Sequence, residues 1–181
     1  MPQLHPTSFP YLTSLLLCCA VGLAVILLLP AHRQREIKQV SAVFSGLTLV
    51  ISLFLYSTYD RGLGGMQFAE SWEWVPALGI SFTNAADGFS LPMLLLTGIV
   101  FFTAVLTAWE LEHRVKEFFA LIYLLVLGVF GLFMSLDLFF IFVWFDVSLF
   151  PMYLLIAIWG RRREGKVRVR EDLTVPTLRD R

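Results

Sequence analysis

One carboxylate inside an apolar run is the feature of this sequence that points most directly to chemistry. Asp146 lies within the 22-residue apolar stretch 138–159, in the segment FIFVWFDVSLFPMYLLIAIWG. As a helix, such a stretch is ~33 Å long and matches the ~30 Å hydrocarbon core of a bilayer. The carboxylate is then within a few residues of the membrane midplane, where an aspartate costs roughly 2.5–3.5 kcal/mol on insertion scales. We therefore expect Asp146 either to interact with another polar or charged group or to have a function in the protein.

Three interpretations of Asp146 remain open from its position alone. It is a proton- or cation-relay site facing the protein interior, a neutral carboxylate hydrogen-bonded to a neighbouring helix, or a side chain beside a water defect. Pro151 favours the relay, because a proline removes a backbone hydrogen bond, can kink the helix and frees carbonyls that hydrate a polar path. No other ionisable Lys, Arg, His, Asp or Glu side chain lies at mid-depth in any apolar span. The sequence therefore predicts that a partner for Asp146 comes from outside this chain.

The composition identifies a polytopic membrane protein and excludes a soluble core. Hydrophobic residues make up 57% of the chain, charged residues 15%, and the mean hydropathy is +0.75. Soluble domains are typically about 45–50% apolar. The adjacent Cys18 and Cys19 point to different faces of a helix, which favours packing roles over a disulfide. The sequence shows no glycine-rich nucleotide loop, metal-ligand cluster or nucleophile–base pair, and its basic tail alone does not support nucleic-acid binding.

The fold class predicted by the apolar runs is an all-α membrane bundle of five spans. Each run must be helical, since an isolated strand leaves backbone groups unsatisfied in lipid. An outer N-terminal segment, 1–10, precedes the five-helix domain, 11–160, and a basic tail, 161–181, follows it. The predicted spans are 11–30, 40–59, 90–109, 117–136 and 138–159.

The charges of the connections predict the orientation. Thirteen of the fourteen Lys and Arg residues lie on one side, in loops 31–39 and 110–117 and in the tail, and only Arg61 lies on the other. The positive-inside rule then places the N-terminus outside and the C-terminus in the cytoplasm. The Arg-rich tail is predicted to be a solvated, poorly ordered end. An out-of-frame translation product and a basic anchor for anionic lipids are the alternatives.

The outer loop 60–89 is acidic and rich in tryptophan. Its Trp72 and Trp74 predict rings at the headgroup level, and docking of a neighbouring subunit is the alternative. Ser90 is predicted to cap the helix that follows, with Pro92 tolerated in its first turn. Asp137, in the three-residue connection Ser135-Leu136-Asp137, is predicted to cap the last helix, with a role in proton entry as the alternative.

Three stretches of the sequence resemble chain M of NADH:quinone oxidoreductase, an antiporter-like membrane subunit of respiratory complex I. FAESWEWVPALGISF, at 68–82, is similar to that family's approach to the third helix. ADGFSLPMLLLT, at 86–97, resembles its VDG-[IL]-SLP motif. The segment 115–160 resembles the fourth and fifth helices nearly throughout. The motif positions are Asp87, Gly88, Ser90, Leu91 and Pro92 in the second stretch and Pro151, Met152 and Tyr153 in the third.

The resemblance implies a role for Asp146. The family carries a glutamate five residues before the P-M-Y sequence, where Asp146 stands here. That glutamate pairs with lysines on later helices to move protons, and the redox chemistry takes place in a separate arm of the complex. NADH, flavin, iron–sulfur clusters and quinone are accordingly expected on partner subunits. The partners expected are other membrane subunits of the complex and the bilayer, in a prokaryotic plasma (inner) membrane.

The sequence departs from the family in two respects. Aspartate is one methylene shorter than glutamate, which reduces its reach by roughly 1–1.5 Å, a gap that water can bridge. The resemblance covers 11–160, about the first third of such a subunit, and the lysine-bearing later helices are missing. Two alternatives therefore stay open: a truncated, non-transporting membrane protein, and the large subunit of a multi-subunit sodium/proton antiporter.

Overall fold

Five long helices and a small sheet form the computed structural model of the chain, which describes residues 4–6, 10–60, 62, 65–75 and 80–160. All five helices are long and apolar enough to cross a membrane. The basic tail, 161–181, lies outside the described residues. The helices are α1 (Tyr11–Leu28), α2 (Gln34–Thr58), α3 (Ser90–Thr107), α4 (Val115–Met134) and α5 (Leu138–Leu155).

The helices differ from the predicted spans mainly at their ends. α2 begins at Gln34, several residues before the apolar run, so Arg35 and Lys38 belong to its first turns. A 3₁₀ turn, Ala108–Glu110, extends α3, and a π-helical turn, Ile156–Gly160, extends α5. Hydropathy marks the segment that is apolar enough for lipid, whereas the hydrogen-bonded helix continues into the polar connections.

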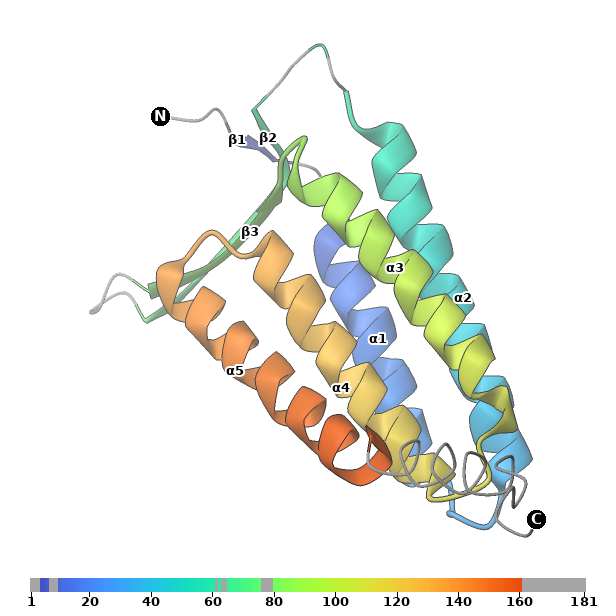
Figure 1. The fold of residues 1–181 in the computed structure, drawn as a ribbon. Helices are drawn as coiled ribbons and strands as arrows, with labels where there is room; N and C mark the ends of the chain where they lie inside the picture. The colour runs from blue at the N-terminus through green and yellow to red at the C-terminus, as the bar shows by residue number, and fades with distance from the viewer. Residues whose placement is uncertain (1–3, 7–9, 61, 63–64, 76–79, 161–181) are drawn as a thin grey trace, which may run out of the picture.

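The helices α1 to α4 pack around a common apolar core, and α5 is attached to one side of it (Figure 1). Tyr123 of α4 is fully buried at the centre of the core. Its hydroxyl donates a hydrogen bond to the Ser41 carbonyl of α2 (2.8 Å), and its ring packs edge-on against Phe101 of α3. Its backbone carbonyl accepts a hydrogen bond from the Cys19 thiol of α1 (3.7 Å). One aromatic residue therefore contacts the three other core helices.

Small side chains allow the core helices to approach closely. α2 buries a row of hydroxyl residues that share one face. Three of them donate hydrogen bonds to carbonyls of their own helix, so they add no unsatisfied donor to the core. Opposite this face, a Cβ on Gly98 of α3 would lie 2.6 Å from the Ser52 hydroxyl. The row consists of Ser41, Ser45, Thr48 and Ser52.

The loop 60–89 forms a sheet together with residues 4–6, which the sequence did not predict. β2 (Met66–Val75) pairs antiparallel with β3 (Ile80–Ala86) and parallel with the short β1 (Leu4–Pro6), in the order β1-β2-β3. The sheet lies across the ends of the helices, opposite the end that carries the basic connections (Figure 1). Trp72 is exposed and stacks on Phe82 of β3. The side chains of Glu73 and Trp74 lie outside the described part.

Glu70 of β2 caps α1 from a distance. α1 follows Pro10 and has no capping side chain of its own and no acidic residue in its first turn. The Glu70 carboxylate accepts hydrogen bonds from the backbone N–H groups of Leu12 (2.9 Å) and Thr13 (3.1 Å), and also from the Thr13 hydroxyl. It thereby satisfies donors that a helix N-terminus leaves free and places a negative charge at the positive end of the helix dipole.

The bulge in β2 helps to aim this carboxylate. Phe68 and Ala69 together oppose the single residue between Asn84 and Ala86 on β3, and Phe68 has a positive φ of 58°. Both Phe68 and Glu70 then reach α1, because the Phe68 ring packs edge-on against Tyr11 at 6.0 Å. Glu70, one of the acidic residues of the loop 60–89, is therefore buried and has a structural role.

Glu70→Gln should destabilise the protein by about 1–2 kcal/mol, because hydrogen bonds to a charged acceptor are worth roughly 1.5–3 kcal/mol and glutamine retains only part of them. Thermal unfolding in detergent micelles measures the effect. Glu36→Gln is the matched control, since Glu36 forms an exposed pair with Arg33 (3.2 Å) and such pairs contribute about 0–1 kcal/mol. Equal effects of the two substitutions would contradict the capping role.

Candidate functional site

The candidate site is on α5, whose position is set by two glycines of α4. A Cβ on Gly131 would lie 2.2 Å from the Trp144 ring, so the indole fits only against a residue without a side chain. A Cβ on Gly128 would lie 2.9 Å from the backbone nitrogen of Ser148 and 3.0 Å from the carbonyl oxygen of Trp144. The two backbones are therefore in direct contact, which is the packing that small residues provide in membrane helices.

This contact determines which way Asp146 points. Trp144, Ser148 and the buried Pro151 face α4. Asp146 is two residues after Trp144, or about 200° further around the helix at ~100° per residue. Its side chain is exposed on the outer face of α5. Within the five helices described, Asp146 therefore lies outside the bundle interior, because the glycine contact fixes the opposite face of α5 as the buried one. The interpretation of Asp146 as a relay site that faces the interior of a larger protein stays a prediction.

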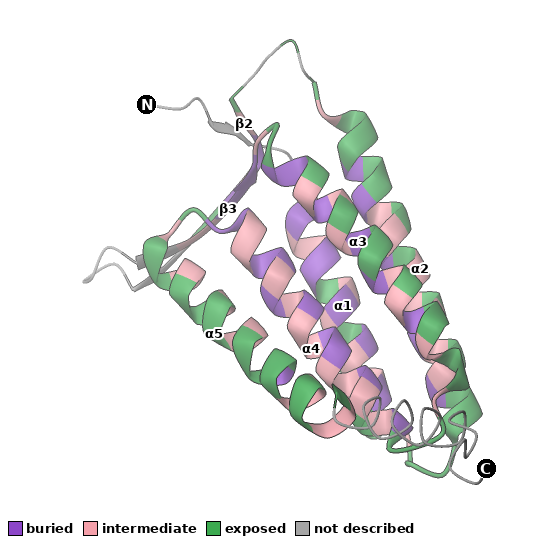
Figure 2. Ribbon diagram, viewed as in Figure 1, coloured by how far each residue is buried: buried purple, intermediate pink, exposed green. Residues whose placement is uncertain are grey.

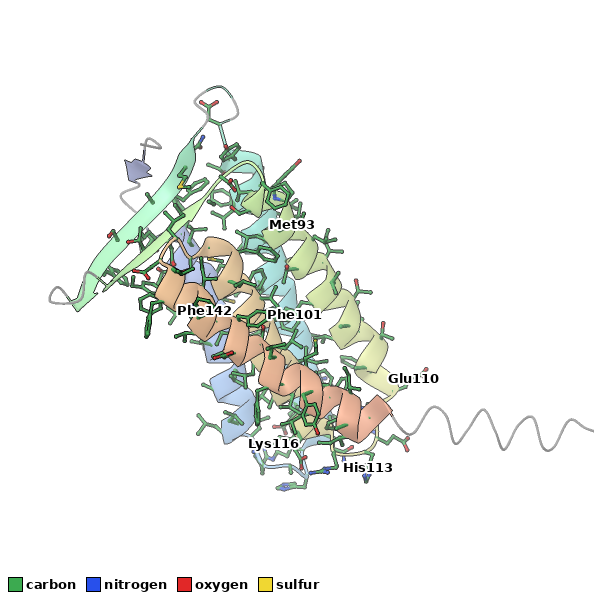
Figure 3. The ribbon with its side chains drawn as sticks, turned by 60° about the vertical axis from the view of Figure 1, so that its left-hand side comes forward. Met93, Phe101, Glu110, His113, Lys116 and Phe142 are labelled. Carbon is green, nitrogen blue, oxygen red and sulfur yellow. The ribbon has the colours of Figure 1, made fainter. Side chains whose placement is uncertain are left out.

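The outer face of α5 is apolar and aromatic around the carboxylate. Figure 3 shows this face at the front, with Phe142 on it. Phe142 is 63% and Tyr153 71% exposed, and both lie on the same side of the helix as Asp146. Figure 2 shows α5 as the helix with the most exposed surface. In the described part of the chain, no hydrogen bond or ion pair reaches the Asp146 carboxylate.

Pro151 lies within α5 and is buried against α4. It has no N–H to donate to the carbonyl of Val147, one residue after Asp146. The π-helical turn that follows, Ile156–Gly160, is a further departure from regular α-helix, and such turns are frequent at functional sites. Met152 and Tyr153 of the P-M-Y sequence are both exposed. A predicted kink at Pro151 stays a prediction.

Asp137 is the N-cap of α5. Its carboxylate accepts a hydrogen bond from the backbone N–H of Phe139 (2.8 Å), which is the capping role predicted for it. The connection between α4 and α5 is also tied to the sheet, since the Leu136 N–H donates to the Thr83 carbonyl (2.9 Å). The start of α5 is therefore held at both its cap and its preceding turn.

At the start of α3, Asp87 takes the role that the sequence analysis gave to Ser90. The Asp87 carboxylate accepts hydrogen bonds from the N–H groups of Ser90 (2.6 Å) and Phe89 (3.2 Å), whereas the Ser90 hydroxyl accepts from the Asp87 N–H (2.9 Å). The Ser90 N–H contact is the main reason why the pKa of the Asp87 carboxyl lies below its usual value. Pro92 is exposed in the first turn, and Gly88 precedes the helix beside Tyr59.

The residues of the two sequence motifs therefore lie in two separate regions of the structure. Asp87, Gly88, Ser90 and Pro92 shape the start of α3, and Pro151, Met152 and Tyr153 accompany Asp146 on α5. Sequence reasoning missed Gly128, Gly131 and Trp144, although a Gly-x-x-Gly pair within an apolar span signals a close helix contact. Among the described residues, no group of three or more His, Cys, Asp or Glu side chains is placed to hold a metal ion.

Comparisons with solved structures define the class of protein. The chain superposes with a TM-score of 0.69 and 27% identity on a chain of respiratory complex I from Thermus thermophilus, covering 84% of this chain and 30% of that one. It also shares its fold with a chain of an archaeal membrane-bound sulfane sulfur reductase, at a TM-score of 0.65 and 18% identity. The five helices are therefore part of an antiporter-like subunit fold found in multi-subunit respiratory membrane complexes.

Sequence relatives show which proteins the chain is homologous to. The chain is 34% identical over 156 residues to NAD(P)H-quinone oxidoreductase chain 4 3 of Picosynechococcus, covering 86% of this chain and 28% of the relative. It is 35% identical over 156 residues to the chloroplastic chain 4 of Chara vulgaris, covering 86% of this chain and 32% of the relative. No protein-family model matches the chain.

The chain is homologous to the N-terminal part of the antiporter-like chain 4 subunits of NAD(P)H-quinone oxidoreductase. It spans less than a third of the length of the curated relatives it matches. The resemblance to a complex I membrane subunit that the sequence motifs indicated is thereby confirmed, as is a multi-pass membrane protein.

Gly131→Ala should destabilise the attachment of α5 by about 1–3 kcal/mol, the usual cost of overpacking, because the added methyl group overlaps the Trp144 ring. Gly46→Ala is the matched control: its Cβ would lie 3.5 Å from the Phe102 ring, an ordinary contact. Alanine should there be neutral or stabilising by up to about 1 kcal/mol. Thermal unfolding in detergent compares the two, and a Gly131→Ala protein as stable as the control would contradict this packing.

Proposed function

We propose that this chain supplies the first five helices of an antiporter-like subunit of an NAD(P)H-quinone oxidoreductase, and that Asp146 belongs to the proton path of that subunit. NADH, flavin, iron–sulfur clusters and quinone are bound by other subunits of the complex. The partners of the chain are the remaining membrane subunits and the surrounding lipid.

The observation that carries this proposal is a carboxylate in the middle of a membrane helix on a face that the described chain leaves open. The four-helix core and the glycine contact leave Asp146 on the outer side of α5. An aspartate facing hydrocarbon alone is costly, so this face requires a covering surface. The relatives extend to about three times the matched length, which supports a covering surface made by further helices of a complete subunit.

The covering surface must place a positively charged side chain close to the Asp146 carboxylate. An isolated carboxylate in a low-dielectric surrounding favours its protonated form, whereas a cation within ~4–6 Å favours its ionised form. A cation that approaches and withdraws therefore drives proton release and uptake at the carboxylate. Asp146 is suited to this role because the described helices offer no fixed competing charge beside it.

We also propose the orientation with the sheet outside and the basic connections in the cytoplasm. Glu110, His113 and Lys116 lie at the end of the bundle opposite the sheet (Figure 3). Lys116 and Lys38 both donate hydrogen bonds at that end, to the carbonyls of Leu27 (2.7 Å) and Trp109 (2.7 Å). Basic side chains near the ends of helices also complement the negative ends of their dipoles.

Asp146→Asn should abolish most of the proton translocation by a complete subunit whose first five helices are those of this chain. The amide keeps the size of the side chain and cannot exchange a proton, and general acid–base groups typically contribute about 10²–10⁴-fold. Proton uptake per electron transferred is the measurement, in membrane vesicles that contain the assembled complex. Asp146→Glu should retain translocation.

Glu36→Gln is the control, because Glu36 lies in the first turn of α2, where it forms an exposed ion pair with Arg33 (3.2 Å). Unchanged proton uptake in Asp146→Asn, with normal assembly, would remove Asp146 from the proton path. The five-helix chain reconstituted alone should move no protons, because the covering charge is absent. Proton flux through it would favour an autonomous transporter instead.

A single cysteine at Phe89 should react with a membrane-impermeant maleimide from outside, and one at Glu112 from the cytoplasmic side. Both positions are exposed at opposite ends of the bundle, and the native Cys18 and Cys19 are first replaced by alanine. Labelling of sealed right-side-out vesicles gives the result directly. The reverse pattern would overturn the proposed orientation.

A further inference from the structure

A row of three buried polar side chains connects the sheet to the ends of two helices. Glu70 of β2 is the backbone partner of Asn84 on β3, and Asn84 is in turn bridged to Ser135 at the end of α4. Side chains of directly paired residues in antiparallel strands lie on the same face. Their exposed fractions are 9%, 0% and 8%. The three side chains therefore lie next to one another, away from solvent.

The hydrogen-bonding groups of this row are not all satisfied by protein atoms. Among the described residues, the buried amide oxygen and nitrogen of Asn84 and the buried hydroxyl of Ser135 have no hydrogen-bond partner. Exchanging the assigned positions of the Asn84 amide oxygen and nitrogen does not change this finding, because both atoms lack a hydrogen-bond partner. Buried polar groups in proteins are paired as a rule, either with protein or with ordered water.

A direct bond between Asn84 and Ser135 does not resolve this arrangement. It would pair one of the two amide groups and leave the other without a partner. The Glu70 carboxylate has about four acceptor positions, and its contacts to Leu12 and Thr13 occupy three of them. One acceptor position is left on the side chain next to Asn84, so the row as a whole needs an additional group that both donates and accepts.

Water has that chemistry. A buried water molecule typically forms about three hydrogen bonds with polar groups that would otherwise be unsatisfied. Here it accepts from the Asn84 NH₂ group and donates to the remaining acceptor position of Glu70, and the Ser135 hydroxyl donates to the Asn84 amide oxygen, so that both amide groups are paired. A metal cation fits less well, since the row offers a single carboxylate that is already bonded to α1.

We propose that Glu70, Asn84 and Ser135 hold one buried water molecule between the sheet and the ends of α1 and α4. This water joins the cap of α1 to the connection that starts α5. Together with the Leu136 N–H bond to the Thr83 carbonyl (2.9 Å), it fixes β3 across the outer end of the α4–α5 hairpin.

The sequence makes this site directly observable. Asn84 is the sole asparagine of the 181 residues, so labelling with ¹⁵N-asparagine gives one side-chain NH₂ pair in an NMR spectrum. The chain is studied in detergent micelles, and contacts of these NH₂ protons with the water resonance are recorded. A held water gives a cross-peak with the sign of a dipolar contact, whereas exchange with bulk water gives the opposite sign in the rotating frame.

The expected result is a dipolar water cross-peak and NH₂ protons that exchange slowly in D₂O. In Ser135→Ala the cross-peak should persist, because Asn84 and Glu70 still hold the water. A signal relayed through the Ser135 hydroxyl would instead disappear. Ser57→Ala is the matched control at the same end of the bundle, since the Ser57 hydroxyl is exposed and bonds to the Phe54 carbonyl (2.8 Å).

Four outcomes would overturn the proposal, and three of them need only the unaltered protein. Rapid exchange of the NH₂ protons would show that Asn84 is open to solvent. Contacts with the Ser135 protons and none with water would show a direct side-chain bond. Loss of the signal in Ser135→Ala with a folded spectrum would show hydroxyl relay. A shift of the NH₂ signals when sodium is replaced by choline would assign the site to a cation and also contradict the proposal.

Discussion

The contact between the backbones of α4 and α5 is the constraint on which the candidate site depends. Gly128 and Gly131 admit the Trp144 ring and the Ser148 backbone at distances that any side chain would prevent. Since this contact fixes the buried face of α5, it also fixes the outward direction of Asp146. The two glycines, which have no reactive side chain, therefore determine which surface the Asp146 carboxylate faces. α4 is held in turn by Tyr123, which contacts the other three core helices.

At the two ends of α1, side chains from other elements form hydrogen bonds with backbone groups that lipid could not satisfy. Glu70 binds the free N–H groups at the N-terminus of this helix, and Lys116 binds the Leu27 carbonyl near its C-terminus. The negative and positive charges match the two ends of the helix dipole. Both side chains come from elements distant in the chain, so the fold ties the sheet at one end and α4 at the other to the first helix.

The sequence predicted what depends on local composition. The five apolar spans, the Asp137 cap and the isolation of Asp146 from other mid-membrane charges all follow from residues close together in the chain. The cap of α1, the sheet and the outward face of α5 did not follow. Glu70 reaches residues 58 and 57 positions away, and the bulge at Phe68 that aims it has no short-range signal. The sequence of α5 did not indicate which of its faces is buried, because apolar residues surround the whole helix. The face that packs against α4 is determined by the glycines of α4.

In the proposed function, the open face of α5 meets a positive charge from outside the five helices. A cryo-EM structure of an assembled oxidoreductase that contains this segment in a complete subunit tests it most directly. We expect a lysine or arginine nitrogen within ~4–6 Å of the Asp146 carboxylate, or joined to it by one water, with Trp144 still packed against Gly131. An Asp146 that faces lipid with no cation nearby, or an α5 rotated so that Trp144 leaves Gly131, would contradict it.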